Sequence, residues 1–482
     1  MILNNISSLS YFIPEIIICL GILLLLIVSV FESMHQKTFM ISIVISILAC
    51  IPILVTFNEY SILFLGNIVI DPYSNFFKIL FLATLGAVII FTYYDKDVER
   101  SDWPEYFSLL LIVTLGMFLM SSTVNLLMVY LAIELVSIPS YILAGFNHND
   151  KSSNEASLKY VLYGSFASGL MLFGMSWIYG QTGSLYFSDI KSALMFLGDG
   201  GSISSLIAFI LLFAGFGYKI SAAPFHYWVP DVYQGAPTPI TAFFSIAPKI
   251  AGLSLLIRFL YFVLAQGAMY SIYVDWNLIL AILSAFTMTI GNILAIRQSN
   301  VKRILAYSSI SHIGFMMMTF AVVSPTSIVH ILFYMVMYMF MTLGAFSVLI
   351  YFYNSYNFNT VDDWKGIGYV HPFICSFMVI NLVALAGLPP TSGFVAKFYI
   401  FATIIESRSY YWLAIVAIIN TVISLYYYFN LARSMFLEEK SKVEYKKLDF
   451  TLVAIIVFTS IQGIVFYFYW SDLYQLIKGL IS

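Results

Sequence analysis

Charged residues are scarce in this sequence: they make up 10% of its 482 residues, whereas hydrophobic residues make up 61%. A soluble protein of this length needs far more charge to cover its surface with groups that water solvates. The shortage of charge, with a mean hydropathy of +0.93, excludes a soluble enzyme and predicts a chain that lies within a lipid bilayer. The net charge of −2 argues against a nucleic-acid partner.

Cysteine is also scarce, and its placement excludes two further kinds of site. Cys19, Cys50 and Cys375 each lie within an apolar run, with no CxxC or Cys/His spacing between them. Neither a disulfide framework nor a metal site is predicted. The sequence also lacks a GxxxxGK loop, a GxGxxG turn between a strand and a helix, and any haem or iron–sulfur cysteine pattern. We therefore expect no metal and no bound cofactor on this chain.

Long apolar runs are what the sequence does contain, and about fourteen of them are long enough to cross a bilayer. Lipid offers no partner to backbone polar groups, so each run is expected to be a helix. No basic residue precedes the first run and no cleavage site follows it, so we expect it to be a retained span. The expected spans are residues 11–31, 38–57, 75–94, 105–122, 124–146, 155–180, 203–227, 237–264, 275–296, 303–323, 327–352, 373–402, 409–432 and 450–470.

The loops between these runs differ in charge, and this difference predicts an orientation. An even number of spans places both termini on one side of the membrane. Thirteen Lys and Arg residues lie in loops after odd-numbered spans, against three on the other side. Because basic loops stay in the cytoplasm or its mitochondrial equivalent, we expect both termini outside.

Six further basic residues fall within the expected spans, and three of these six lie near span ends. Lys78 and Arg258 are within about two turns of an end, where a long side chain can reach the headgroups, so we expect them to be structural. Lys159 lies one turn into its span and four residues after Glu155, a spacing that allows a surface ion pair. Its role as a surface pair or a functional group stays open at this point.

Glu134, Lys219, Lys249 and Lys397 are different because they fall near mid-membrane. A charge at that depth costs at least about 2.5 kcal/mol, so four of them predict a polar or hydrated interior. Internal ion pairs that only hold helices together are the alternative. Three lysines cannot be balanced by one glutamate, which favours a path for protons.

Two of these lysines adjoin prolines that interrupt their spans. Lys219 precedes residues 220–239, which contain four prolines, and Lys397 follows Pro389 and Pro390. Proline cannot continue a helix, so broken helices are predicted in spans seven and twelve. These spans are five apart, which suggests two five-helix units of opposite orientation with the functional site at the breaks. Ordinary kinks are the alternative interpretation.

Several stretches resemble one protein family. They are ELVSIPSYILAG, EASLKYVLYGSFASG, GYKISAAPFHYWVPDVYQGAPTPITAFFSIAPK, VKRILAYSSISHIGF and GLPPTSGFVAKFYIF. In this order they are similar to subunit N of the proton-pumping NADH:quinone oxidoreductase, respiratory complex I, called subunit 2 in mitochondria. The resemblance covers about residues 105–404.

The resemblance implies an all-α polytopic membrane protein with the antiporter-like fold. That fold has about 14 transmembrane helices, two inverted five-helix repeats, and broken helices 7 and 12. The implied division is a three-helix segment over 1–104, repeats over 105–264 and 275–432 that each form a proton half-channel, and a C-terminal helix over 450–482.

The resemblance also implies site residues. The family's functional charges fall on Glu134 in helix five, Lys219 in helix seven, Lys249 in helix eight and Lys397 in helix twelve, and Lys159 matches a further family lysine. A sister subunit commonly has glutamate where this chain has Lys397. Animal mitochondrial forms lack the first three helices, so this chain looks like the bacterial type in the cytoplasmic membrane, or a mitochondrial inner-membrane version that kept the whole fold.

These residues suggest a mechanism. Burial favours a neutral lysine amine, whereas a nearby carboxylate favours the ammonium form. We expect Glu134 to pair with Lys219 in one state; when they separate, the proton passes toward Lys249, then to Lys397 and the outer side. Secondary candidates for this path are the histidines His312 and His330 and the hydroxyls of Ser308, Ser309 and Ser311, although a lone histidine in an apolar span is more often a core residue.

The chain is expected to act only with partners. By resemblance, NADH, FMN, iron–sulfur clusters and quinone are bound in other subunits of complex I, and the neighbours include sister antiporter-like subunits and the lipid bilayer. Two alternatives stay open. One is a subunit of a multi-subunit cation/proton antiporter, and the other is a membrane scaffold whose buried charges only pack helices.

Overall fold

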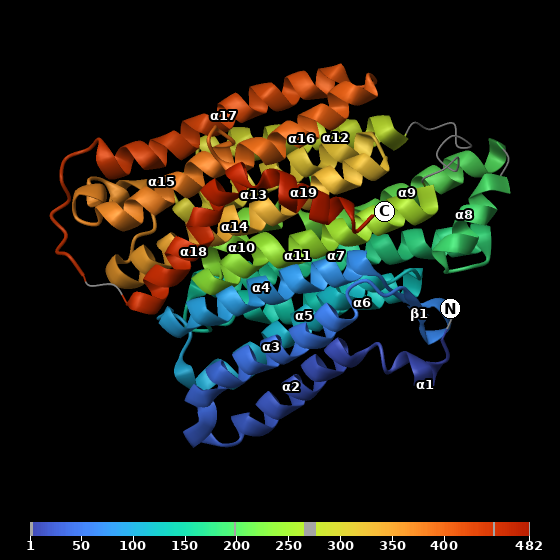
Figure 1. Cartoon of the computed structure of the whole chain (residues 1–482), viewed down its shortest axis with the longest axis horizontal. Coiled ribbons are helices and arrows are strands. Elements are labelled where there is room, and N and C mark those ends of the chain that lie inside the picture. The colour runs from blue at the N-terminus through green and yellow to red at the C-terminus, as the bar shows by residue number, and fades with distance from the viewer. Residues whose placement is uncertain (1–2, 197–198, 265–275, 447–448, 482) are drawn as a thin grey trace.

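The computed structural model describes residues 3–196, 199–264, 276–446 and 449–481, and they are almost wholly helical. Most of the long helices lie side by side with similar axis directions (Figure 1). Eleven described helices are long and apolar enough to cross a membrane, and three shorter apolar helices cover Ile13–Ser29, Ser204–Ile220 and Pro372–Ala386. The prediction of an all-α membrane protein is confirmed. Parts of the expected spans, loops and domains lie outside the described residues, namely 1–2, 197–198, 275, Lys447 and Ser482.

The N-terminal part contains four helices and a small hairpin that the sequence did not predict. Its strands have three residues each and pair antiparallel, with Ser61 opposite Ile70. A carboxylate of Asp71 caps the following helix by accepting from the Ser74 backbone N–H at 2.7 Å. The elements are α1 (Asn5–Ser8), α2 (Ile13–Ser29), α3 (Thr38–Val55), β1 (Ser61–Leu63), β2 (Ile68–Ile70) and α4 (Pro72–Tyr94).

Two groups of helices follow, and each contains a short interruption beside a lysine. The first group is α5 (Trp103–Ser122), α6 (Leu126–Ala144), α7 (Lys151–Thr182), α8 (Phe187–Phe196), α9 (Asp199–Ile220), α10 (Trp228–Gly235) and α11 (Thr238–Phe259). The second is α12 (Trp276–Ile296), α13 (Val301–Met317), α14 (Pro325–Tyr356), α15 (Pro372–Ala386), α16 (Ser392–Ser407) and α17 (Tyr411–Phe436).

The described chain ends with α18 (Phe450–Phe468) and α19 (Trp470–Lys478). Short 3-10 turns connect the longer helices, and one π-helical turn extends α11. They are η1 (Glu32–Lys37), η2 (Phe64–Gly66), η3 (Arg100–Asp102), η4 (Leu260–Leu264), η5 (Met318–Ala321), η6 (Val361–Trp364) and η7 (Ile367–Tyr369).

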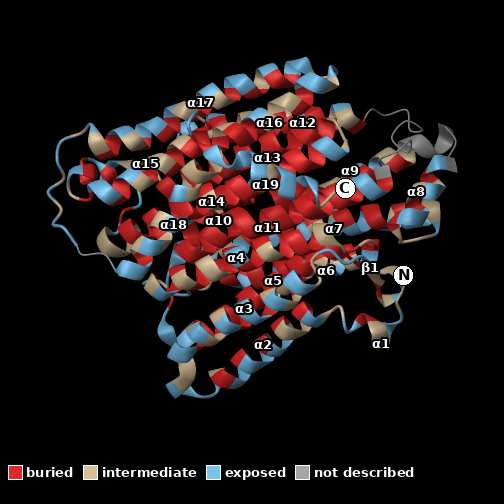
Figure 2. Ribbon diagram, viewed as in Figure 1, coloured by how far each residue is buried: buried red, intermediate tan, exposed pale blue. Residues whose placement is uncertain are grey.

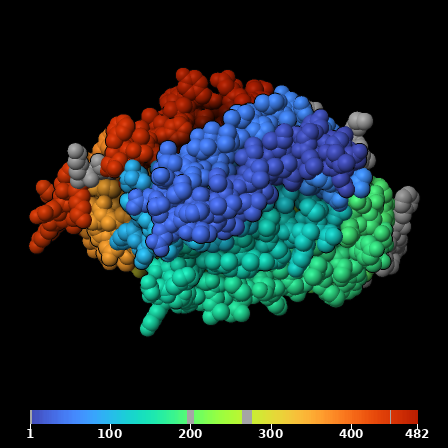
Figure 3. Space-filling view, turned by 90° about the horizontal axis from the view of Figure 1, so that it is seen from below, coloured from blue at the N-terminus to red at the C-terminus, as the bar shows by residue number. Residues whose placement is uncertain are grey.

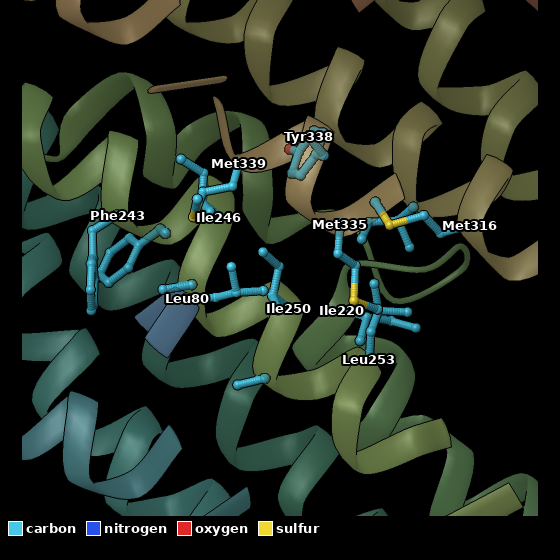
Figure 4. Packing of buried hydrophobic residues seen from close by; sticks show 14 of the residues in the cluster. Leu80, Ile220, Phe243, Ile246, Ile250, Leu253, Met316, Met335, Tyr338 and Met339 are labelled. Atoms are coloured by element: carbon cyan, nitrogen blue, oxygen red, sulfur yellow. The ribbon is translucent and has the colours of Figure 1, made fainter. Parts of the chain in front are cut away.

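The centre of the molecule is formed by α11, α13 and α14, which are buried along nearly their whole length (Figure 2). Ile246, Ile250 and Leu253 of α11 pack near Met335 and Met339 of α14 (Figure 4). Helices that carry Lys249 and several histidines and serines are thus the most enclosed ones. The polar side chains point into protein, and lipid is left to the outer helices.

The outer helices expose large apolar side chains. On α17, Ile415, Ile418 and Val422 are each more than half exposed, and on α3 so are Ile47 and Leu54. The N-terminal helix α2 packs against α5, and α3 packs against α4 and α5; their blue surface lies beside the teal surface of the helices that follow (Figure 3). Apolar outer surfaces of this kind suit contact with lipid chains.

The expectation that Lys78 and Arg258 reach the headgroups is wrong. Lys78 is 1% exposed and its Nζ lies 2.6 Å from an oxygen of Glu15. Arg258 is 2% exposed and donates to both oxygens of Asp71, at 3.0 and 2.9 Å. Their partners lie far away along the chain, so helical spacing could not reveal these buried pairs. The Lys78–Glu15 pair joins α4 to α2, and the Arg258–Asp71 pair joins α11 to the start of α4.

We expect Lys78→Met to lower the stability of the protein by about 3–5 kcal/mol, because it leaves the Glu15 carboxylate buried without its ion partner. The double variant Glu15→Gln with Lys78→Met should recover much of this loss. The measurement is the thermal unfolding midpoint of the purified protein in detergent. A single variant as stable as the exposed control Lys440→Met would contradict the importance of this pair.

Candidate functional site

Lys219 lies in the last turn of α9, where the helix ends against a break. The break begins with Ser221, whose φ of +62° cannot continue a right-handed helix. The indole N–H of Trp228 then donates to the Tyr218 carbonyl at 3.1 Å and satisfies one of the carbonyl groups that the helix end leaves free. A lysine at a helix C-terminus is favoured by the helix dipole. Lys219, which is 2% exposed, therefore lies inside the protein beside the polar end of a helix.

Lys219 faces α6, the helix that carries Glu134. Its Nζ donates to the Ser137 hydroxyl at 3.1 Å, and Ser137 follows Glu134 by three residues on the same helix face. Glu134 is close enough for its charge to act on Lys219, yet no ion pair within 4 Å joins them among the described residues. Oxygen Oε1 of Glu134 is buried and lacks a hydrogen-bond partner. The structure thus shows the two groups as neighbours that are not in contact.

Lys249 lies in the middle of α11 and contacts the second group of helices. Its Nζ donates to the Ser309 hydroxyl of α13 at 2.6 Å and lies 5.2 Å from the centre of the Tyr233 ring. The side chain is 1% exposed, and no carboxylate lies within 4 Å of it in the described chain. Ser309 in turn donates to the Ala306 carbonyl at 2.6 Å. The hydroxyl is therefore the polar bridge from Lys249 to α13.

His312 continues this polar row one turn further along α13. Its Nδ1 lies 2.7 Å from the Tyr334 hydroxyl, and its Nε2 lies 3.2 Å from the Tyr428 hydroxyl. Tyr428 also bonds to Ser308. The imidazole ring is close enough to both Lys249 and Lys397 for electrostatic interaction with each of them. His312 thus lies between the central lysine and the last one, within a cluster of hydroxyl groups.

Lys397 lies on α16, just after the interruption that follows α15. Its Nζ donates to the Ala386 carbonyl at the end of α15, at 2.8 Å, and lies 4.6 Å from the centre of the Phe315 ring. Gly387 ends α15 with a φ of +80°, and a Cβ there would lie 2.6 Å from the Lys397 side chain. The turn therefore places a cation against a helix C-terminus, where it is stabilised.

Two of the expected path residues lie apart from this row. Lys159 is 35% exposed and forms ion pairs with Glu155 at 2.7 Å and with Asp231 at 2.6 Å, while Asp231 also binds Arg303. His330 bonds instead to the Thr403 hydroxyl at 2.5 Å and to the Tyr474 hydroxyl of α19 at 3.3 Å. The structure thus gives Lys219, Lys249, His312 and Lys397 buried polar contacts inside the helix bundle, whereas Lys159 and His330 have other surroundings.

Comparison with known proteins shows the family to which this chain belongs. A family model described as NADH:quinone oxidoreductase/Mrp antiporter, TM, matches residues 123–424. NADH-quinone oxidoreductase subunit N 2 of Sorangium cellulosum is 39% identical over 504 residues, which cover 100% of this chain and 98% of that protein. The chain belongs to the NADH-quinone oxidoreductase subunit N family.

Further members of the subunit N family and solved structures agree. Subunit N of Anaeromyxobacter sp. is 38% identical over 90% of this chain and 89% of that protein. A chain of respiratory complex I from Thermus thermophilus superposes with a TM-score of 0.80 and 27% identity, covering 96% of this chain and 98% of that one. A chain of the Mrp complex from Dietzia sp. gives a TM-score of 0.85 at 18% identity, covering 98% and 97%, which shows a shared fold alone.

The tyrosines are what sequence reasoning missed in this subunit N chain. Tyr233 lies beside Lys249, and Tyr334 and Tyr428 lie beside His312, but nothing along the sequence distinguishes these three from the other tyrosines among the 35 in the chain. One partial signal was available in the sequence. Tyr334 and Tyr338 are four residues apart, so their side chains lie on the same face of one helix. Ser137 was also missed, although it follows Glu134 by three residues.

We expect Gly387→Ala to destabilise the protein, because the added methyl group meets the Lys397 side chain and the left-handed backbone alone costs about 1–2 kcal/mol. Gly180→Ala is the matched control, since a Cβ there meets no atom within 4 Å. The thermal unfolding midpoint in detergent tests both. Equal midpoints for the two variants would show that the turn tolerates a side chain beside Lys397.

Proposed function

We propose that this chain carries protons across the membrane as a subunit of NADH:quinone oxidoreductase. The observation that supports this proposal is the set of buried titratable groups Lys219, Lys249, His312 and Lys397, with the partly buried Glu134 near Lys219. Hydroxyl groups of Ser137, Ser309 and Tyr428 lie between them. Lys249 and His312 lie on α11 and α13, two of the most enclosed helices, and lysines buried without an ion partner are costly unless they have a function.

The finer architecture is part of this proposal. We infer that the eleven long helices and the three shorter apolar ones make fourteen spans, with α9 and α10 forming one broken helix and α15 and α16 another. Lys219 precedes its interruption and Lys397 follows its own. The two interruptions are five spans apart, and consecutive units of five spans cross the membrane in opposite orientations, which supports two inverted repeats over 105–264 and 275–432. The segments 1–104 and 450–482 flank the repeats.

The chemistry of the row is proton exchange between amines, imidazole and hydroxyl groups. The Glu134 charge favours the ammonium form of Lys219 when the two approach, and Lys219 releases its proton when they separate. In this structure they are not in contact, so it corresponds to the separated arrangement. Lys249 then receives the proton, and Ser309 and His312 lead from it toward Lys397. Lys159 and His330 remain secondary candidates for proton uptake and release.

The driving reaction is assigned to partner subunits. We infer that NADH, FMN, iron–sulfur clusters and quinone are bound there, and that sister antiporter-like subunits pack beside this chain. The relatives named above are bacterial, which supports the bacterial cytoplasmic membrane as its location. The thirteen basic loop residues support cytoplasmic odd-numbered loops and termini on the outer side. A cation/proton antiporter subunit, the alternative function, is supported by likeness of fold alone.

We expect Lys219→Ala and Glu134→Ala to assemble into the complex but to translocate at least about tenfold fewer protons per quinone reduced, because each removes a proton-accepting group or its charge partner. Proton uptake by inverted vesicles, divided by quinone reduction, measures the effect. The exposed Lys440→Met serves as control. Unchanged pumping in either assembled variant would rule out the proposed path.

A native gel of gently solubilised membranes distinguishes the two candidate functions. We expect an affinity-tagged chain to migrate with a large band that stains for NADH dehydrogenase activity, since its redox partners must remain attached. A tag found only in smaller bands without this activity, together with sodium-dependent proton flux in vesicles, would instead favour the antiporter.

A further inference from the structure

An apolar cavity of about 240 Å³ lies between α9, α11 and α12. Every described residue in its wall has an aliphatic or aromatic side chain. A buried water molecule needs several polar partners, so a cavity with these walls stays dry. Apolar cavities of only about 150 Å³ already bind hydrocarbons such as benzene. The cavity is therefore a site for an apolar ligand.

The cavity follows the helix axes and is here called the slot. On α9 its wall runs from Phe209 to Phe216, and on α12 it runs from Trp276 to Leu283. Within both stretches the wall residues follow the spacing i, i+3, i+4 and i+7, which is one face of a helix over two turns. Two turns of helix span about 10 Å. The slot is therefore long and narrow.

Two contacts show that α9 and α12 run in the same direction along the slot. In the first half of both helices, the ring centres of Phe209 and Trp276 lie 5.3 Å apart. Beyond the end of α9, the Ala223 backbone N–H donates to the Thr287 hydroxyl at 3.1 Å. Tryptophan at the start of a membrane helix is typical of the headgroup level. The slot therefore extends from near one membrane surface toward the middle of the bilayer.

The inner end of the slot is formed by the break that follows Lys219. Pro224 and Phe225 belong to this break, and both lie in the wall of the slot. Phe225 packs closely on α9, because a Cβ added at Gly217 would lie 3.0 Å from its ring. A ligand in the slot thus touches the break itself as well as the helices on either side.

The slot opens sideways onto the lipid-facing surface. Ile210 in its wall is 51% exposed, and Ile282, on the rim at α12, is 52% exposed. Both belong to the apolar outer surface, so acyl chains are the medium at the opening. A partner helix about 10 Å wide and two turns long needs far more space than the slot offers. A single acyl chain is the occupant that suits this width, polarity and direction.

We propose that the slot binds one acyl chain of a membrane lipid, which packs α9 against α12 and supports the break at Pro224 and Phe225. This proposal goes beyond proton transfer and holds whichever path the protons take. The chain enters sideways past Ile210, with its ester end near Trp276 and its methyl end at Phe225. Because the wall offers no charge to a headgroup, the slot recognises the hydrocarbon chain that phospholipids share.

Photo-crosslinking in vesicles tests the slot. The assembled complex is reconstituted into vesicles of phosphatidylethanolamine and phosphatidylglycerol. A small fraction of the phosphatidylethanolamine has a diazirine in one acyl chain, either near the ester or near the methyl end. After irradiation, peptide mass spectrometry maps the adducts. Ile279→Trp fills the slot, and Ile282→Trp, on the exposed surface of the same helix, is the matched control.

We expect the methyl-end probe to label Phe225 and the near-ester probe to label Trp276. Ile279→Trp should reduce both adducts at least about fivefold, because a filled and close-packed slot has no room for a chain. Ile282→Trp should leave both unchanged, and neither variant should alter labelling of the exposed Ile418 on α17.

Three outcomes would overturn the proposal. Equal labelling of Phe225 by the two probes would show that no chain is held in one direction. Adducts that Ile279→Trp does not reduce would come from ordinary surface lipid. A slot without adducts in the complex would have another occupant, such as a side chain of a partner subunit.

A second variant covers the case in which Ile279→Trp fails to assemble. Leu283→Phe narrows the slot without filling it, so we expect it to reduce the Phe225 adduct about twofold. The comparison of the two probes on Phe225 and Trp276 needs no variant at all. An adduct yield in Leu283→Phe equal to that of the unmodified chain, with no difference between the probes, would again overturn the proposal.

Discussion

Three lysine ammonium groups buried without carboxylate partners are the constraint on which the structure depends. Burying a charge is costly, and a lysine at the bilayer centre needs polar groups in place of water. Here the substitutes are a hydroxyl for Lys219, a hydroxyl and an aromatic ring for Lys249, and a helix-end carbonyl for Lys397. Each of these lysines therefore has protein groups in place of part of the water that would otherwise solvate it.

The helix interruptions follow from the same constraint. The last carbonyls of a helix have no N–H partner within the helix, so a helix end offers free acceptors to an ammonium group. Ending α15 at Gly387 gives Lys397 the Ala386 carbonyl, and ending α9 at Ile220 places Lys219 in the last turn. By contrast, Lys78 and Arg258 sit in continuous helices and each has a carboxylate. Among the described residues, Lys78 and Arg258 are thus buried with an ion partner that joins helices, whereas Lys219, Lys249 and Lys397 are buried without one.

The charged residues of the site could be recognised from the sequence, but their hydrogen-bond and ion-pair partners could not. Glu134, Lys219, Lys249 and Lys397 were visible because charge is rare in apolar runs and because prolines mark the breaks. The partners Ser309, Tyr428 and Tyr334 were not distinguishable from many other serines and tyrosines, since they lie 60 or more residues from Lys249 or on other helices. The same distance along the chain concealed the pairs of Lys78 with Glu15 and Arg258 with Asp71.

Composition and periodicity by themselves determined the fold class: an apolar chain must satisfy its backbone within each segment, so helices at the apolar runs were the only solution in lipid. The sequence motifs indicated the family. The few charged residues within apolar runs indicated the candidate site residues. The tertiary structure alone decided which of these residues meet: it joined His312 to the lysine row, left His330 with Thr403 and Tyr474, and tied Lys159 to Asp231. It did so because contacts between helices depend on how their faces turn toward one another, and spacing along one helix carries no information about its neighbour.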